Sequence, residues 1–221
     1  RLADNPALSS AQDADSLLCI YLMPKPRPWC NLVGLGPQRD RFLRESLQGL
    51  KEQLQALGQD LMVLEGSPEL VLPNIVDRFS IDRVTTSYTP GWYETQAIAF
   101  LEQKLPATLS VFRGSKLFDA EQFPFAMEDL PDTFSPFRRK VEKVNISSPV
   151  AAPSALPPPP SAQFDAIPRA AASPHPGLPL PGGSAAGLRR LDQFLFHTHA
   201  IADYKQTRND LDGLSGSSTL S

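Results

Sequence analysis

A cluster of small and hydroxyl-bearing residues near the end of the chain is the strongest candidate for chemistry. The segment YKQTRNDLDGLSGSSTLS, residues 204–221, offers several hydroxyls and backbone N–H groups in a short glycine-containing stretch. Such groups suit a phosphate or pyrophosphate, because they donate hydrogen bonds to anionic oxygens. The same composition is typical of a flexible serine-rich tail, which the segment taken alone favours. The interpretation therefore depends on the rest of the chain.

Other polar clusters do not indicate hydrolytic or metal chemistry. The acidic run Glu128–Asp132 resembles a pair of catalytic carboxylates, but no base or nucleophile lies near it, so a solvated loop is the better interpretation. His197 and His199 are two positions apart on a predicted helix and face different sides, and His175 lies in a proline-rich stretch. We therefore predict no metal site.

Large aromatic residues and two cysteines complete the set of candidates. Trp29, Trp92 and Tyr93 could contact a chromophore, but on loops between strands and helices such side chains more often pack at the rim of the core. Cys19 lies in an apolar run and Cys30 in a proline-rich loop, which fits neither a disulfide framework nor a metal site. We expect both cysteines to be reduced thiols.

Short apolar runs alternate with helical patterns between residues 15 and 112, which is typical of parallel βα units. The run LLCIYLM is apolar on both faces, so helices should cover both sides of its sheet. We predict an α/β fold with a Rossmann-like, doubly wound parallel sheet. The predicted strands are Ser16–Leu22, Leu61–Leu64, Arg83–Ser87 and Leu109–Phe112.

Three helices are predicted between these strands. Arg39–Leu57 carries apolar residues at helical spacing, and Gly58 should end it. Ser67 is expected to be the N-cap of a helix over Pro68–Phe79, and a third helix is predicted over Tyr93–Leu105.

The composition changes after Val144, because 11 of the 23 prolines lie between Pro149 and Pro181. Such a stretch should form an extended or disordered connector. Helical spacing returns from about Ala185 to Tyr204. We expect an α/β domain at 1–146, a flexible proline-rich linker at 147–183 and the start of an all-α domain at 184–221.

Composition and charge exclude several classes of protein. The formal net charge is −3 and the pI is about 5.6, so the chain lacks the basic excess of a self-sufficient DNA-binding domain. No stretch approaches the roughly 18 consecutive apolar residues of a membrane span, and the N-terminus shows no signal pattern. We expect a monomer without membrane attachment in the cytoplasm, with organellar or nuclear locations open in a eukaryote.

Three strings, in the right order, resemble the DASH branch of the photolyase/cryptochrome family. RLADNPAL at Arg1–Leu8 is similar to the segment after the family's first strand. LPDTFSPFRRKVE at Leu130–Glu142 resembles the recurring LPD-x-F-(T/S)-x-FR-(K/R)-x-VE of DASH proteins. GGSAAGLRRL at Gly182–Leu191 and IADYKQTRNDL at Ile201–Leu211 resemble the run that opens the family's helical flavin domain. Three ordered matches arise by chance far less often than one.

The resemblance implies an FAD site whose phosphates are held by hydroxyls and backbone amides. Thr219 stands where relatives often carry a basic residue. The resemblance also implies a folate or deazaflavin antenna in the α/β domain, although the matching loop reads SYTPGWYE and keeps only Glu94 of a His-Glu-Glu type run. The residues implied to line the FAD site are Tyr204, Ser217, Ser218, Thr219, Leu220 and Ser221.

The resemblance implies a blue-light flavoprotein that repairs cyclobutane pyrimidine dimers, preferably in single-stranded DNA, or senses light. FAD would be the electron donor, and DNA would bind to the helical domain. We expect this chain to be an N-terminal fragment that does not catalyse repair alone, with the first strand of the domain lying before Arg1.

Two alternatives remain open: a non-catalytic interaction or signalling domain, and an unrelated nucleotide-binding domain of the adenine-nucleotide hydrolase type. The latter would need a glycine-rich loop after its first strand, and the sequence shows none.

Overall fold

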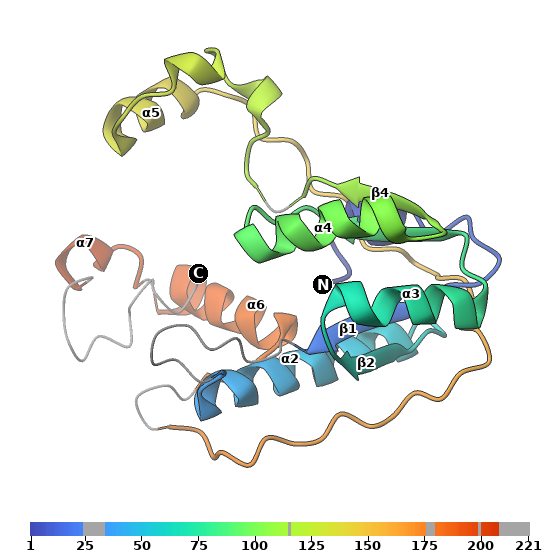
Figure 1. Ribbon diagram of the computed structural model, residues 1–221. Helices are drawn as coiled ribbons and strands as arrows, with labels where there is room; N and C mark the ends of the chain where they lie inside the picture. The colour runs from blue at the N-terminus through green and yellow to red at the C-terminus, as the bar shows by residue number, and fades with distance from the viewer. Residues whose placement is uncertain (24–33, 115, 176–179, 199, 208–221) are drawn as a thin grey trace. The chain divides into compact units, whose positions relative to one another are not determined.

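The computed structural model describes residues 1–23, 34–114, 116–175, 180–198 and 200–207. Contacts divide the chain into two compact units. Unit 1 comprises Arg1–Leu18 and Glu65–Ser161, and unit 2 comprises Cys19–Leu64 and Ala162–Ser221. Figure 1 shows the elements of both units.

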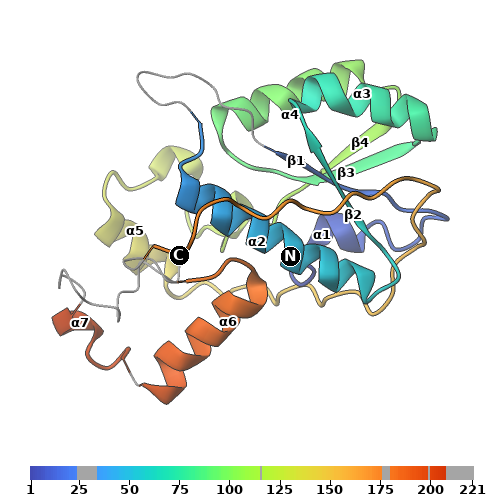
Figure 2. The same cartoon turned by 90° about the horizontal axis from the view of Figure 1, so that it is seen from below.

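Unit 1 is built on a pair of parallel strands, β3 (Arg83–Ser87) and β4 (Thr108–Phe112), with Thr85 opposite Ser110. Helices α3 (Pro68–Phe79) and α4 (Trp92–Lys104) lie on one face of this pair, and the short α1 (Pro6–Ser9) lies on the other (Figure 2). Helices on both faces of parallel strands are the arrangement that the sequence predicts for this region. The buried apolar side chains that join these layers are Ala7, Ile75, Val76, Ala97 and Leu101.

Helix α3 has the predicted bounds, but its first turn differs in detail. Ser67 occupies the N-cap position without a side-chain capping hydrogen bond. Pro68 at the start of the helix fixes a helical φ angle and removes one of the N–H groups that have no partner within the helix, which favours a helix start at this position. Ser80 ends the helix in the left-handed region, with φ of 50°.

Unit 1 also contains a helix that the sequence analysis did not predict, α5 (Phe134–Val141), after two 3₁₀ turns, η1 (Ala120–Gln122) and η2 (Met127–Asp129). Helix α5 lies within the LPDTFSPFRRKVE string. Phe134 and Phe137 of α5 form an aromatic cluster with Phe123 and Phe125, in which the ring centres of contacting pairs are 5.4 to 6.4 Å apart. A short helix held by aromatic contacts lacks the long apolar period that pattern analysis needs.

Unit 2 contains the two-stranded sheet of β1 (Cys19–Met23) and β2 (Leu61–Glu65) and the long helix α2 (Pro37–Gln55). Leu47 and Leu54 of α2 are buried, and Gly58 adopts φ of 76° just after the helix, where the sequence predicts its end. Each described sheet has two strands, so the doubly wound order of all four strands stays a prediction.

The predicted continuous helix from Ala185 to Tyr204 is wrong. Helix α6 (Ser184–Asp192) passes into a π-helical turn, η3 (Gln193–His197), and α7 (Tyr204–Thr207) is separate. The backbone N–H and the hydroxyl of Thr198 both donate hydrogen bonds to the carbonyl of Gln193, at 2.9 and 3.0 Å. A threonine hydroxyl that binds the backbone in this way competes with helix propagation, which explains the break.

The described parts of the proline-rich segment contain no helix, and hydrogen bonds attach them to the rest of the chain at several points. The N–H of Leu17 donates to Pro158 O at 3.0 Å, and that of Asp4 donates to Val150 O at 2.6 Å. Side chains of α2 bind the later residues, as described below. The composition predicted a flexible linker because such a stretch cannot bury enough surface to fold alone, but its carbonyls still accept hydrogen bonds from the rest of the chain.

Candidate functional site

The structure describes only one of the residues predicted to bind FAD. Tyr204 opens α7 and is partly buried. The other predicted contacts lie outside the described residues: Ser217, Ser218, Thr219, Leu220 and Ser221. The predicted cofactor site therefore stays a prediction, and the structure shows instead what holds the segment that leads to it.

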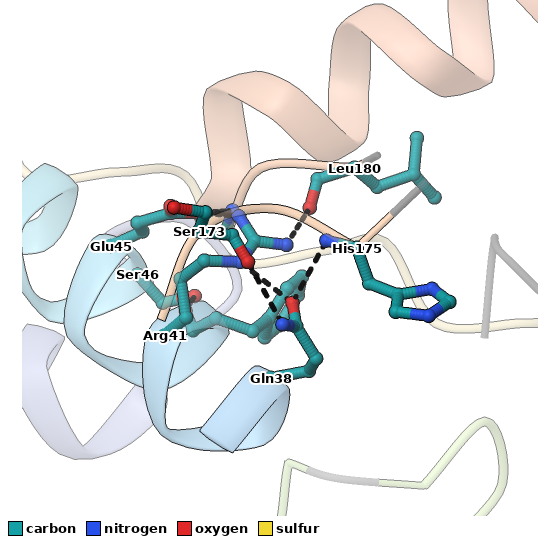
Figure 3. Close-up of polar contacts among 9 residues, drawn as sticks. Gln38, Arg41, Glu45, Ser46, Ser173, His175 and Leu180 are labelled. Carbon is teal, nitrogen blue, oxygen red and sulfur yellow. Dashed lines mark hydrogen bonds and ion pairs between the residues drawn. The ribbon is translucent and has the colours of Figure 1, made fainter. Parts of the chain in front are cut away.

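Arg41 is the central residue of a polar cluster on α2. Its side chain is only 4% exposed. Nη1 donates to both carboxylate oxygens of Glu45, at 2.8 and 3.0 Å. Nη2 donates to the carbonyl of Leu180 at 3.1 Å, and Nε donates to Oε1 of Gln38 at 3.2 Å (Figure 3). The N–H of Gly182 donates to Oε2 of Glu45 at 2.7 Å. One ion pair, between the buried Arg41 and the partly exposed Glu45, thus binds the main chain at two points just before α6.

The two glycines before α6 have different roles. A Cβ atom at Gly182 would come within 2.2 Å of Phe42 O and 2.9 Å of Ser46 N, so only glycine allows this approach to the backbone of α2. Gly183 adopts φ of 97°, a conformation that turns the chain into α6 and disfavours side chains. We call the set formed by Gly182, Gly183 and the Arg41–Glu45 pair the α2–α6 joint.

Further along α2, other side chains bind the preceding residues of the segment. Nε2 of Gln38 donates to Ser173 O at 2.9 Å, and its Oε1 accepts from the N–H of His175 at 3.3 Å (Figure 3). Nη1 of Arg44 donates to Pro168 O at 3.3 Å. Side chains of α2 thus bind the segment at the carbonyls of Pro168, Ser173 and Leu180.

Lys51 is the second largely buried cation of α2. Its Nζ pairs with Asp60, donates to Leu61 O at 3.3 Å and lies 5.8 Å from the ring centre of Phe164. Burial raises the pKa of the Asp60 carboxyl, but hydrogen bonds from Lys51, the Leu61 N–H and Gln55 outweigh this effect and hold the pKa below its ordinary value.

In the same unit, burial raises the pKa of the Cys19 thiol to about 11, which keeps it protonated and unreactive near neutral pH.

The loop proposed for an antenna lies in unit 1, between β3 and α4. Trp92 is 71% exposed and Tyr93 is 49% exposed, so Trp92 is not packed at the rim of the core as the sequence analysis expected. Its position at the first residue of α4 explains the difference, since the helix buries Ala97 and Leu101 on another side. Trp29 lies outside the described residues.

The remaining candidate groups stay apart. Asp129 and Asp132 are exposed, as expected of a solvated loop. Nε2 of His197 lies 2.7 Å from Asp192, and His199 is outside the described residues. Within the described part of the chain, no three histidine, cysteine or carboxylate side chains are placed to hold a metal ion. Among the same residues, no helix is long and apolar enough to cross a membrane.

No pattern in the sequence predicted the α2–α6 joint. Arg41 and Glu45 stand four residues apart on a helix, which is typical of a solvated ion pair. The nearest signal was the pair Gly182–Gly183 before a helix, because adjacent glycines often mark a close backbone approach.

Comparisons with known proteins agree with the resemblance. A family model described as DNA photolyase matches residues 1–160. Proteins named Cryptochrome DASH from Gloeobacter violaceus and Synechocystis sp. are 35% and 34% identical over 241 and 244 residues; the alignments cover 100% of this chain and 47% and 48% of those proteins. The chain spans about half the length of the curated relatives it matches.

Solved structures show the same fold. A Synechocystis sp. cryptochrome matches with a TM-score of 0.84 at 30% identity, over 95% of this chain and 47% of that one. A class III photolyase from Agrobacterium tumefaciens matches with a TM-score of 0.74 at 22% identity, over 94% of this chain and 44% of that one.

Proposed function

This chain belongs to the DNA photolyase family, and we propose that it forms the N-terminal part of a blue-light flavoprotein of the DASH cryptochrome type. The observation that carries the proposal is the 34–35% identity to Cryptochrome DASH proteins along the full chain. The whole protein would repair cyclobutane pyrimidine dimers, preferably in single-stranded DNA, or sense light. Its DNA contacts would lie in a helical domain that α6 begins.

The cofactor of the proposed protein is FAD. When it is bound and reduced, FAD supplies on excitation the electron that splits a pyrimidine dimer. Tyr204 would line the site, and the hydroxyls and amides of Ser217–Ser221 would bind the phosphates. The partial burial of Tyr204 at the first residue of α7 is compatible with this role.

The α/β part of the chain would support the helical domain and hold a folate or deazaflavin antenna. The support role has the stronger basis, because α2 binds the segment before α6 at several points. The antenna role rests on the family alone.

The test uses the protein encoded by the complete reading frame. We expect purified protein to contain about one FAD per chain and, under blue light, to remove thymine dimers from a single-stranded oligonucleotide faster than from a duplex. Protein that holds FAD but repairs no dimer would indicate the light-sensing branch of the proposal. Protein without any flavin would contradict the proposal.

A tyrosine pair tests the site itself. Tyr204→Ala should increase the rate at which FAD dissociates, whereas Tyr93→Ala, on the exposed start of α4, should leave it unchanged. Equal FAD dissociation rates in the two variants would show that Tyr204 does not contact FAD.

The alternative is a non-catalytic interaction domain. Exposed apolar side chains on α4 favour it, since Trp92 and Phe100 are 71% and 41% exposed. Retention of flavin by the complete protein decides against this alternative.

A further inference from the structure

We propose that the α2–α6 joint positions the flavin domain: the Arg41–Glu45 pair and Gly182 fix the direction in which the chain leaves the α/β part. The proposal rests on the function proposed above, because the positioned segment leads to the predicted FAD contact Tyr204. It assigns to Arg41, Glu45 and Gly182 a role in positioning the segment that carries the predicted cofactor site.

The first support is the burial of a charged side chain with a main-chain target. A buried guanidinium costs several kcal/mol to desolvate unless carboxylate and carbonyl oxygens replace the water. Arg41 meets this need with Glu45 and with Leu180 O, which belongs to a segment 139 residues away in sequence. The carbonyl of Leu180 replaces a water at the guanidinium, so release of the segment would break this hydrogen bond, and burial of the charge is coupled to docking of the segment.

The second support is the arrangement of the two contacts. Glu45 lies one turn after Arg41 and accepts the N–H of Gly182, two residues after Leu180. Two fixed points so close together on an extended chain define a direction as well as a position. Gly183 then turns the chain, and Ser184 begins α6, so no free residue separates the joint from the helix.

The third support is steric. Gly182 lies against the backbone of α2, where a Cβ atom would meet Phe42 O at 2.2 Å, and a backbone cannot move aside as a side chain can. Gly187 in the middle of α6 is the matched control, because a Cβ atom there meets nothing within 4 Å. Gly187→Ala should even favour the helix, because alanine has a higher helix propensity than glycine.

The first experiment compares Gly182→Ala with Gly187→Ala by amide hydrogen exchange. In Gly182→Ala, we expect amides of α6 to exchange about tenfold faster or more, while those around Leu47 on α2 keep their protection. Gly187→Ala should not accelerate exchange. Equal exchange in α6 for the two variants would overturn the proposal. Glu45→Gln is a milder second variant that keeps an acceptor for Gly182 but loses the charge, so it decides the question if Gly182→Ala fails to fold; it should accelerate exchange in α6 by a smaller factor.

The second experiment measures FAD in the protein of the complete reading frame. Gly182→Ala should shift the visible circular dichroism of the flavin and increase its dissociation rate about tenfold, and Gly187→Ala should do neither. Faster exchange in α6 with an unchanged flavin spectrum would overturn the positioning role. Absence of flavin from the unsubstituted protein would instead overturn the proposed function, and the exchange experiment would still decide whether the joint fixes α6.

Discussion

Residues 147–161 and residues 162–183 belong to one proline-rich segment, but different donors hold the two stretches. In the first stretch, main-chain N–H groups of Asp4 and Leu17 donate to carbonyls. In the second stretch, the donors are mainly side chains of α2. A main-chain donor survives every substitution except proline, whereas one substitution removes a side-chain donor. Single substitutions on α2 should therefore detach residues 162–183 from that helix, whereas single substitutions should leave residues 147–161 attached.

The largest effect is expected from Arg41→Met. The change leaves Leu180 O and the Glu45 carboxylate without their buried donor, so the free energy of unfolding should fall by about 2 kcal/mol. Urea unfolding followed by far-ultraviolet circular dichroism measures this loss. Trypsin cleavage after the exposed Arg169, within the second stretch, should also accelerate.

Arg44→Met is the control for that variant, because the side chains of Arg44 and its partner Asp40 are 26% and 28% exposed. We expect a loss of less than about 1 kcal/mol, as for other partly solvated pairs. If the two arginine variants lose the same free energy, the α2–α6 joint is not a special point of attachment.

A smaller effect is expected from Lys51→Met. The variant loses the ion pair with Asp60 and the cation–π contact with Phe164, and it should reduce the free energy of unfolding by about 1 to 2 kcal/mol. Phe164→Leu keeps an apolar contact and should cost only about 0.5 kcal/mol. A larger loss in Phe164→Leu than in Lys51→Met would mean that the aromatic ring, and not the ion pair, holds this part of the segment.

The Asp60 carboxyl predicts a pH dependence of the attachment. Its pKa is lowered in the folded protein, so its contribution to stability is complete above the unfolded pKa of about 3.9 and is lost as the pH falls through the folded pKa. The stability difference between the unsubstituted protein and Asp60→Asn should therefore shrink below about pH 4. Urea titrations across that range measure it. A difference that stays constant with pH would show that the Lys51 ion pair contributes no stability.

The smallest effect is expected in the first stretch, from Ser16→Ala. The Ser16 hydroxyl donates to Pro158 O at 3.1 Å, but the N–H of Leu17 donates to the same oxygen. The loss should stay below about 0.5 kcal/mol in the same urea assay. A loss as large as that of Arg41→Met would remove the distinction between the two stretches.

Local sequence patterns predicted the regular elements of the α/β part. The bounds of β3 and α3 are as predicted, and those of β2, β4 and α4 differ by one residue at one or both ends. Strand β1 begins three residues later than predicted, and α2 begins and ends two residues earlier. These elements follow from apolar periodicity and from proline or glycine at their ends, which act within a few residues. Helix α5 was missed because its stability comes from phenylalanines that meet only after folding.

The FAD site was predicted from the resemblance to a family, whereas the α2–α6 joint, which holds the chain before α6, was not predicted. Ordered strings such as LPDTFSPFRRKVE led to the photolyase family, which the family match confirms. They also led to Tyr204 and Ser217–Ser221 as FAD contacts, which stay predictions. Nothing in the pattern of α2 separates Arg41 from the solvated charges around it.

The sequence by itself determined the family, the parallel βα pattern and the non-helical course of the described proline-rich segment, because family strings, periodicity and proline content are local properties of the chain. Only the tertiary structure decided that this segment is held and that Arg41 is buried. Gly182 must be a glycine because α2 lies against it. These facts depend on groups more than 130 residues apart in sequence, and no local pattern encodes which carbonyl a buried cation will meet.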